Sequence, residues 1–492
     1  MKRKKLNLIK IESEADFGRF IRQVSTTEVI KNIYLLSKEV YLKRCKSIKR
    51  KITYNGIEGL VYIQPWQFAD LAYQSIKFSN DYRNSDELSY DQSLLLLYET
   101  NSYIEMKMEN NTFDLITQYD KDVYLYGLGG EQYEYQSEVY YFRNLIRELY
   151  ILFSLTERSN YYKDIIEKEV GVNWQNLITI LFGIFINSLF EQKIDDAVNY
   201  IKIDGNKEEI FKKVLKYYTA DYKEIRESNL NRQIFYVKPY AKNQRNEIVT
   251  VSVYFNEFIV EHAAYWVIRN YYLKQESKSK QTFVNEFGIL YEKYFENICI
   301  KYHVQKEKIK KSEKEKRADW KLQIDNQIIL IEQKSFILPI EIKQQLTNVD
   351  KYKKIIERNI VYALEQLEQT EKNLNLHNAI KIVLCYDRYI NPNLLNNIFD
   401  DENCKVKNDG RYFLANTTEI EMLLELSSKD KQLFKKVISD MINRKNYNGN
   451  IIMYIMIENK WTTNSYYKEQ IFDEYKELLK DVKNRHEKFR KL

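Results

Sequence analysis

Glycine and proline are scarce in this chain, which has only 12 glycines and 4 prolines among its 492 residues. Such a low content excludes a collagen-like or proline-rich protein and argues against an all-β fold with many tight turns. Hydrophobic residues make up 44% of the chain, which is too many for an intrinsically disordered protein. We therefore expect a helix-rich globular protein, and its length suits about three domains.

Cysteine and histidine are also rare, with four residues of each kind. The cysteines are far apart in the sequence, no Cys-x-x-Cys pair occurs, and no histidine stands at zinc-ligand spacing. This pattern argues against a disulfide scaffold and a structural zinc site. Near the N-terminus, Lys10 and Glu12 interrupt the apolar stretch before it reaches signal-peptide length, so we expect a cytoplasmic protein.

Long apolar runs are nearly absent. Residues 170–190 carry no charge, but their continuous apolar centre covers only residues 177–186. A membrane-spanning helix needs about 20 predominantly apolar residues. We interpret this segment as a buried core helix and expect no membrane partner.

The charge balance is close to neutral for so large a chain, with 77 Lys and Arg against 70 Asp and Glu, a formal net charge of +7. This excludes a polycationic, histone-like protein. The phosphate-binding motif G-x-x-x-x-G-K-[ST] does not occur. If the reaction is driven by ATP, a partner has to supply the energy. We therefore expect a separate ATPase or sensor subunit as a candidate partner.

Hydrophobic patterning predicts an α+β multidomain protein. We expect an α+β module at residues 1–140, with strands at 57–66 and 102–108. A mainly helical module follows at 141–273, where the run 234–237 is strand-like. The polar stretch 274–281 marks a domain boundary.

After this boundary the expected order is helix, basic loop, two strands, helix, two shorter strands and a further helix, within a domain at residues 274–430. The last of these helices, at 419–426, is preceded by Thr418 and contains Glu421, which have the spacing of a capping box. Residues 431–492 form a charged helical extension in this interpretation.

The segment 317–335 brings charged residues into an apolar strand. If Asp325 and Asn326 form a two-residue hairpin turn, Ile324 pairs with Gln327, and Asp319 comes to lie opposite Glu332. Lys334 shares their face because side chains alternate along a strand. The hairpin is therefore predicted to bring two carboxylates and an amine together.

Two adjacent carboxylates repel each other, and the run 328–331 beside them is wholly apolar. A divalent cation removes this repulsion, and Mg²⁺ prefers oxygen ligands. The alternative is a solvated hairpin face with a simple Lys and Glu pair. Such a face would alternate apolar and polar residues, which residues 328–331 do not. The pattern therefore favours a metal site suited to phosphodiester hydrolysis.

Asp319, followed by Glu332-Gln333-Lys334 at the end of an apolar strand, resembles the Asp and Glu-x-Lys signature of the PD-(D/E)XK nuclease superfamily. The core of that superfamily is an αβββαβ unit, as in restriction endonucleases. The resemblance covers about residues 282–430, and the N-terminal region resembles no family. One departure is Ala318, which stands where many members have a proline.

The neighbouring helices extend the resemblance. Gly288 and Glu292 match a Gly-x-x-x-Glu pattern of the first helix, although Glu286 and Glu296 are alternatives on the same helix. On the following helix Gln366 matches a glutamine near the site, and Gln369 is the second choice.

The resemblance implies a role for each of these residues. Asp319, Glu332 and Lys334 would be catalytic, with Glu292 and Gln366 in support. Mg²⁺ or Mn²⁺ would be bound by the two strand carboxylates and the main-chain carbonyl of Gln333, with Glu292 as a further candidate ligand.

A basic run precedes the first strand of the hairpin. Residues 306–317 contain seven bases and three acids, and their position beside the site suits contacts to nucleic-acid phosphates. A solvated loop is the alternative. The candidate phosphate contacts are Lys306, Lys308, Lys310, Lys311, Lys314, Lys316 and Arg317.

The sequence therefore predicts a metal-dependent nuclease that acts on DNA, with RNA still open as a substrate. Its N-terminal region would recognise the substrate or a partner. Bacterial restriction and anti-phage systems also place a nuclease module after a long sensing region. By this analogy alone we expect a role in such defence. The alternative is a catalytically silent nucleic-acid-binding or scaffold subunit. Self-association into a homo-oligomer is a further expectation that the sequence leaves open.

Overall fold

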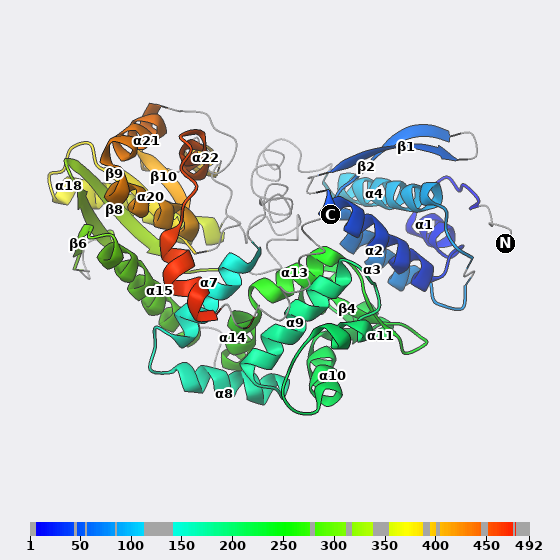
Figure 1. The fold of residues 1–492 in the computed structure, drawn as a ribbon. Coiled ribbons are helices and arrows are strands. Elements are labelled where there is room, and N and C mark those ends of the chain that lie inside the picture. Colours follow the sequence, from blue (N-terminus) through cyan, green and yellow to red (C-terminus); the bar gives the residue numbers. More distant parts are fainter. Residues whose placement is uncertain are drawn as a thin grey trace.

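The computed structural model describes residues 6–43, 47–54, 57–83, 86–112, 141–275, 281–310, 317–337, 354–386, 394–399, 404–443, 451–475 and 478. These residues form a helix-rich α+β structure of several parts (Figure 1). The chain begins in a lobe at the right of the figure, continues through helices at the bottom and enters a second lobe at the left.

The described residues of the N-terminal lobe form four helices and one β-hairpin. Its elements are α1 (Glu14–Ile21), α2 (Thr26–Leu42), β1 (Ile48–Tyr54), β2 (Ile57–Ile63), α3 (Gln67–Phe78) and α4 (Tyr90–Thr112). The predicted strand at residues 102–108 is wrong, because these residues belong to α4. Leu96, Thr100 and Tyr103 follow helical spacing and are all buried, so burial along one helix face outweighed the short alternating pattern.

The middle of the chain is mainly helical, as predicted. It contains α7 (Tyr141–Phe153), α8 (Ser159–Val170), α9 (Trp174–Ser188), η2 (Asp195–Tyr200), α10 (Lys207–Tyr218), α11 (Tyr222–Glu227), η3 (Asn231–Gln233), α12 (Ile234–Val237), α13 (Val253–Glu261) and α14 (Ala263–Gln275). A small sheet is made by β3 (Thr219–Asp221), β4 (Tyr240–Lys242) and β5 (Ile248–Thr250). The strand-like run 234–237 is the short helix α12, because four consecutive apolar residues carry no periodicity that distinguishes the two structures.

The uncharged segment near residue 180 forms the core helix α9, and residues 177–188 are all buried. Gly183 lets the segment that follows pack closely, since a Cβ at this position would lie only 2.2 Å from the side chain of Ile201. In the part of the chain that the structure describes, no single helix is long and apolar enough to cross a membrane. By length and composition, the bent pair α8 and α9 passes the same test.

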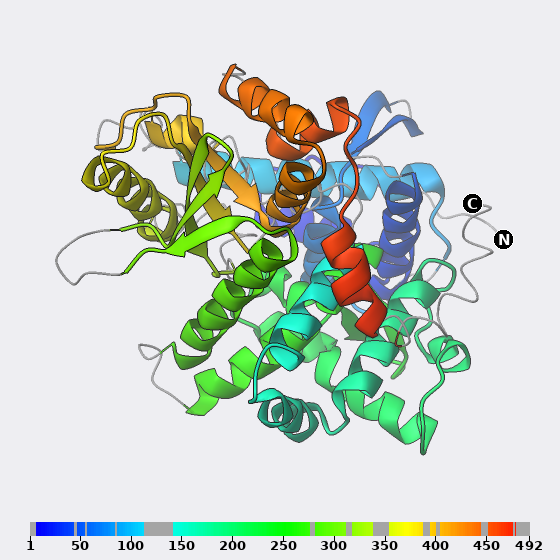
Figure 2. The same cartoon turned by 60° about the vertical axis from the view of Figure 1, so that its left-hand side comes forward.

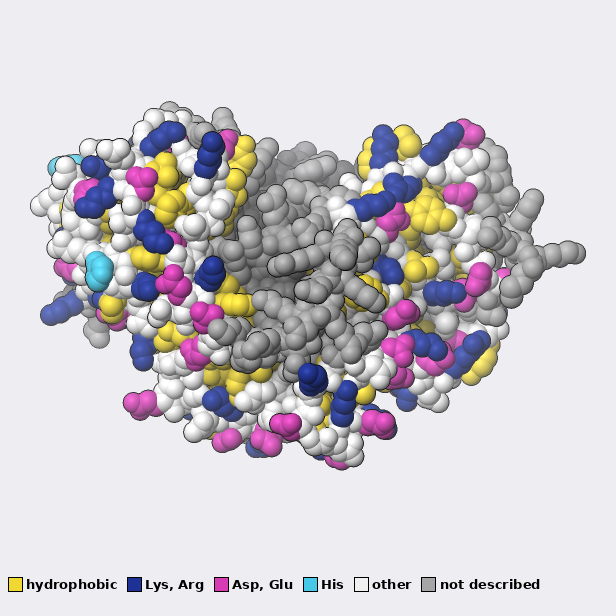
Figure 3. All heavy atoms as spheres, in the orientation of Figure 1, with side chains coloured by type: hydrophobic (Ala, Val, Ile, Leu, Met, Phe, Trp, Pro, Cys, Tyr) yellow, Lys and Arg dark blue, Asp and Glu magenta, His cyan; other side chains and the backbone are white. Residues whose placement is uncertain are grey.

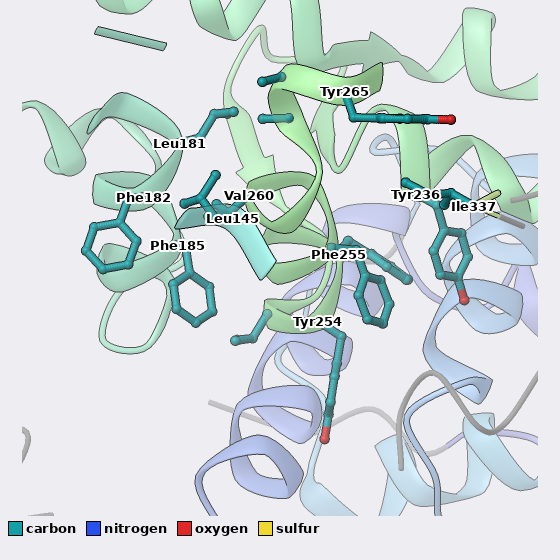
Figure 4. Packing of buried hydrophobic residues seen from close by; sticks show 14 of the residues in the cluster. Leu145, Leu181, Phe182, Phe185, Tyr236, Tyr254, Phe255, Val260, Tyr265 and Ile337 are labelled. Atoms are coloured by element: carbon teal, nitrogen blue, oxygen red, sulfur yellow. The ribbon is translucent and has the colours of Figure 1, made fainter. Parts of the chain in front are cut away.

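Aromatic residues from several helices meet in this part of the core (Figure 4). The ring of Phe255 on α13 lies 5.0 Å from that of Tyr236 on α12, measured between centroids. Ile337, which follows the central sheet of the second lobe, belongs to the same cluster. The helical part and the second lobe therefore share one continuous core.

The second lobe is built around a five-stranded sheet with the order β10-β9-β8-β7-β6. The elements are α15 (Thr282–Lys301), β6 (Gln305–Lys308), β7 (Trp320–Ile324), β8 (Gln327–Lys334), η5 (Glu357–Val361), α18 (Tyr362–Asn373), β9 (Ile380–Cys385), α19 (Leu394–Phe399), β10 (Tyr412–Asn416) and α20 (Thr417–Lys429). Strands β6, β7 and β8 are antiparallel, whereas β8, β9 and β10 are parallel. Helix α18 makes the crossover between β8 and β9.

Strand β6 differs from the expectation, because its residues lie in the run interpreted as a basic loop and as the approach to it. Its sequence Gln-Lys-Glu-Lys is polar and mostly exposed, as suits an edge strand that pairs only with β7. Strands of this kind carry no apolar signal, so pattern analysis misses them.

The C-terminal extension contains α21 (Lys431–Asn443), α22 (Ile451–Glu458) and η6 (Tyr467–Phe472). Both ribbon views show η6, drawn in red, beside α7, drawn in cyan (Figures 1 and 2). The capping box of α20 is formed by Asn416 and Glu419, three residues apart, and not by Thr418 and Glu421 as predicted. Helix α20 begins earlier than predicted because Asn416, the last residue of β10, is also the N-cap of the helix.

Glu421 has a different role, since it joins the helical part to the sheet lobe. Its two carboxylate oxygens accept hydrogen bonds from Nε and Nη2 of Arg147 on α7, at 2.8 and 2.9 Å. Both side chains are almost fully buried. Arg147 also donates to Asn144 Oδ1 and Thr418 Oγ1, so each of its three side-chain nitrogens forms a hydrogen bond.

Candidate active site

The hairpin of β7 and β8 has the predicted register. Ile324 pairs with Gln327, and Trp320 pairs with Ile331, across the turn at Asp325 and Asn326. Asp325 has a φ of 49°, and the favoured two-residue hairpin turns have a positive φ at this first position. The sequence pattern therefore located the turn and the register of residues 320–324 with 327–331 correctly.

Asp319 precedes the last pair of this ladder, and its arrangement differs from the prediction. Its N–H donates to the carbonyl of Ile331, the residue that already pairs with Trp320. The predicted direct pairing of Asp319 with Glu332 is thus replaced by an offset of the chain. The Asp319 carboxylate nevertheless reaches β8, because its Oδ2 accepts a hydrogen bond of 2.9 Å from the N–H of Gln333.

Both carboxylates of the predicted site are buried, and the residues Asp319 and Glu332 are each only 2% exposed. Glu332 Oε1 accepts a hydrogen bond of 2.7 Å from Lys334 Nζ. The second oxygens, Asp319 Oδ1 and Glu332 Oε2, are also buried. Two negative groups and one ammonium therefore lie together at the end of β8, in an environment where charge is poorly solvated.

Gln366 on α18 joins this group. Its Oε1 accepts a hydrogen bond of 3.3 Å from Lys334 Nζ, and its Nε2 donates to the carbonyl of Arg317 at 3.0 Å. Gln369, the second choice, is exposed and donates to Asn373 on its own helix. The structure therefore brings Gln366, and not Gln369, into contact with the predicted site.

Thr370 was not identified from the sequence, although it anchors the site. Its hydroxyl accepts a hydrogen bond of 2.7 Å from the N–H of Ala318 and donates to the carbonyl of Gln366. It thus ties the residue before Asp319 to α18. Its position one helical turn after Gln366 is a usable signal, but only once the helix face toward the strand is known.

The side chain of Gln333 has a structural role that the sequence did not indicate. Its side chain is buried, accepting from Trp320 Nε1 at 2.6 Å and donating to the carbonyl of Tyr291 at 3.3 Å. The carbonyl of Ile331 accepts from the N–H of Asp319 and so lies on the β7 side of β8. Carbonyls alternate between the two sides of a strand, so that of Gln333, two residues later, also points toward β7. The predicted metal-binding carbonyl therefore faces the same edge as the Asp319 backbone.

Helix α15 packs against the end of β8. A Cβ at Gly288 would lie 3.1 Å from Ser335 Oγ, so the small residue permits a close approach of helix and strand. Glu292 lies one turn further along α15, and its Oε2 accepts a hydrogen bond of 2.5 Å from Lys308 Nζ on β6.

No three side chains of His, Cys, Asp or Glu within the described ranges lie close enough together to hold a metal ion. In this structure Glu292 is therefore not a third carboxylate of the site.

The predicted phosphate contacts are only partly described. Lys306 and Lys308 lie on β6 and form ion pairs with Glu296 and Glu292 of α15, which offset their charge. Lys310 is exposed, and its carbonyl accepts a hydrogen bond from Arg317. Lys311, Lys314 and Lys316 lie outside the described residues.

Charge is mixed on the face of the molecule seen in Figure 3. Basic and acidic side chains alternate over both lobes among the coloured residues, without a patch of one sign. A broad electrostatic footprint for nucleic acid is therefore not visible on this face, and Lys310 and Arg317 are the better candidates for local contacts.

Comparisons with known proteins identified no relative: the chain matches no protein-family model, no curated protein and no solved structure.

Proposed function

We propose that this protein is a metal-dependent nuclease that hydrolyses phosphodiester bonds of DNA. The observation that carries the proposal is the grouping of buried Asp319 and Glu332 with Lys334, whose ammonium also contacts Gln366. Two carboxylates, an ammonium and an amide in one place are more than a folded hairpin needs. They suit the neutralisation and positioning steps of phosphoryl chemistry.

The order of elements supports the same proposal. Among the described elements, helix α15, strands β6, β7 and β8, helix α18 with η5 before it, and strand β9 come in the order of the αβββαβ unit of PD-(D/E)XK nucleases. In both, the site residues stand on the second and third strands and on the next helix. The resemblance thus extends from the short motif to the arrangement around it.

The donor set fits a hard divalent cation. Asp319, Glu332 and the carbonyl of Gln333 would hold Mg²⁺ or Mn²⁺ through oxygen, and waters and substrate phosphate would complete its shell. When bound, such an ion lowers the pKa of a coordinated water and offsets the charge that develops on phosphate. Two protein carboxylates are enough for Mg²⁺, which usually keeps several waters.

Lys334 and Gln366 have separate tasks in this proposal. The ammonium of Lys334, which is held between Glu332 and Gln366, would stabilise negative charge on the phosphate and orient the attacking water. Gln366 acts through Lys334 as a positioning residue, because its other end is fixed on the carbonyl of Arg317. Thr370 fixes α18 to the strand in turn.

The test is cleavage by the purified full-length chain. Supercoiled plasmid, linear duplex DNA, single-stranded DNA and RNA are incubated with Mg²⁺, Mn²⁺ or a chelator. We expect cleavage of DNA that requires the metal, and Asp319→Ala and Lys334→Ala should each lower the rate by about 100-fold or more. Matched controls are Asp325→Ala in the hairpin turn and Lys321→Ala on β7, which should cleave at the wild-type rate.

Equal loss of cleavage in all four variants would refute this site. Metal-independent cleavage would refute the metal chemistry. If no substrate is cleaved while DNA still binds, the alternative of a catalytically silent subunit replaces the proposal. A role in restriction or anti-phage defence is tested separately, by plating phages on cells that express the wild type or Asp319→Ala.

A further inference from the structure

A cavity of about 890 Å³ lies in the helical part of the chain, between α8, α10, α12, α13 and α14. Three of the helices that line it, α8, α10 and α14, lie near the bottom of Figure 1. This volume is within the range of pockets that hold small organic ligands. None of the residues of the proposed nuclease site lines it.

The inner wall of this cavity is aromatic. Tyr218, Tyr236 and Phe258 are buried, whereas Tyr217 and Trp266 are half-buried. Planar side chains of this kind bind a flat aromatic ring by stacking or edge contacts. The wall therefore favours a ligand with an aromatic ring system.

The rim of the cavity is cationic. Its five basic residues face a single carboxylate, that of Glu169, which pairs with Lys274 outside the lining. The basic residues are Lys168, Lys213, Lys216, Lys238 and Arg269. The first three are exposed, so the positive charge is concentrated toward solvent while the aromatic rings lie deeper.

Two of these cations are already paired, since Lys213 contacts Glu209 and Lys238 contacts Glu224. Lys168, Lys216 and Arg269 form no ion pair with any residue in the described ranges. The guanidinium of Arg269 lies 5.9 Å from the ring centre of Trp266. A cation and an aromatic ring are thus available side by side at the entrance.

The floor of the cavity is held in place by buried hydrogen bonds. His262 Nδ1 lies 2.9 Å from Glu148 Oε2 on α7, and Glu148 Oε1 accepts from the N–H of Tyr265 at 2.9 Å. Glu148 adjoins Arg147, which binds Glu421 of the sheet lobe. The site is therefore preformed, so a ligand does not have to order it on binding.

We propose that this cavity binds a nucleobase with an attached phosphate. The base would lie against Trp266 and the deeper rings, and the phosphate would contact Lys216 and Arg269 at the rim. This chemistry is offered by a free nucleotide or by a base turned out of a nucleic-acid strand. The site is independent of Asp319, so neither proposal requires the other.

The experiment is calorimetric titration of the full-length chain in a chelating buffer. The probes are ATP, GTP, CTP and UTP, with inorganic triphosphate and adenosine as fragments and a short single-stranded oligonucleotide as the second source. We expect one site whose affinity for the nucleotide exceeds that for either fragment at least about tenfold. A preference for the mononucleotide over the oligonucleotide, or the reverse, identifies the source.

Variants locate the site. Trp266→Ala and Lys216→Glu should each weaken binding at least about tenfold, because they remove the stacking surface and a phosphate contact. Lys212→Glu, on the same helix but outside the lining, should change it by less than about twofold. Asp319→Asn should bind as the wild type does. Circular dichroism checks that each variant is folded.

The proposal is overturned if no nucleotide and no oligonucleotide binds. Triphosphate that binds as tightly as the nucleotides would also overturn it, because the base would then contribute nothing. The same holds if Lys212→Glu weakens binding as much as Lys216→Glu, or if Asp319→Asn abolishes binding.

Discussion

Two groups of buried charged residues differ in the partners that their carboxylates contact. Around Arg147 and Glu421 one cation meets one carboxylate, and Asn144, Thr418 and Tyr294 add hydrogen bonds. At the end of β8 Glu332 accepts from the ammonium of Lys334, and Asp319 accepts from the N–H of Gln333, the residue between them. The first group pairs one carboxylate with one guanidinium, whereas the second gathers two buried carboxylates at one end of a hairpin.

The difference separates a structural role from a chemical one. Burial lowers the pKa of the Arg147 guanidinium. The Glu421 carboxylate and Tyr294 together raise it by more, so its pKa lies well above the ordinary value. Arg147 therefore stays protonated, and its contacts with Glu421 lie wholly inside the protein. The group at β8 offers carboxylate oxygen atoms of the kind that a divalent cation prefers, as the proposed function requires.

The largest effect is expected for Arg147→Met. This change leaves the carboxylate of Glu421 buried without its guanidinium, at a cost of about 3 to 5 kcal/mol in the free energy of unfolding. Urea denaturation followed by circular dichroism measures it. The double variant Arg147→Met with Glu421→Gln should recover a large part of the loss, since it removes the buried charge. A single variant as stable as the wild type would contradict the structural role.

Glu419 extends the comparison to a carboxylate held by main-chain donors. Burial raises its pKa to about 7, although the N–H groups of Asn416 and Met453 lower it in part. Between pH 4.5 and about 7 the unfolded chain releases this proton while the folded chain keeps it, so stability falls as pH rises. The free energy of unfolding falls by about 3 kcal/mol across this range.

The pH dependence is tested with Glu419→Gln, which should flatten the fall in unfolding free energy across this pH range. The slope, and not the absolute stability, is the readout, because the substitution also alters the helix cap. Glu208→Gln, exposed on α10, is the control and should keep the wild-type slope. Parallel slopes for both variants would show that Glu419 does not cause the dependence.

Mg²⁺ should stabilise the folded protein through the group at β8. At a concentration tenfold above its dissociation constant, the ion adds about 1.4 kcal/mol to the free energy of unfolding. Asp319→Asn should abolish this gain, because it removes one of the two carboxylates proposed to bind the ion. Thermal melts of both proteins with and without Mg²⁺ measure the gain. Asp325→Asn should respond to the ion as the wild type does, and an equal response of Asp319→Asn would count against the metal site.

The smallest effect is expected on α18. Gln366→Ala removes one hydrogen bond to Lys334 and should lower the cleavage rate about fivefold, whereas Gln369→Ala should leave it unchanged. Rates under single-turnover conditions distinguish the two. A larger loss for Gln369→Ala would mean that the opposite face of the helix serves the substrate.

Local patterns predicted a large part of this site. The turn at Asp325, the register of β7 and β8 and the burial of Glu332 follow from a two-residue loop and an apolar run, which act over neighbouring residues. The edge strand β6 and the offset at Asp319 did not follow. Both depend on which backbone groups a neighbouring strand leaves for pairing, and no periodicity in the chain records that choice.

By itself the sequence determined a helix-rich α+β chain in which Asp319, Glu332 and Lys334 are drawn together by one hairpin, because strand alternation and turn chemistry are local. Tertiary structure decided which partners these residues meet. It selected Gln366 over Gln369, paired Glu292 with Lys308, and turned Glu421 from a predicted cap into the partner of Arg147. These contacts join residues that lie on different elements, which only the folded chain brings together. Where the residues are buried, as Arg147 and Glu421 are, the contact also supplies the partner that a buried charge needs.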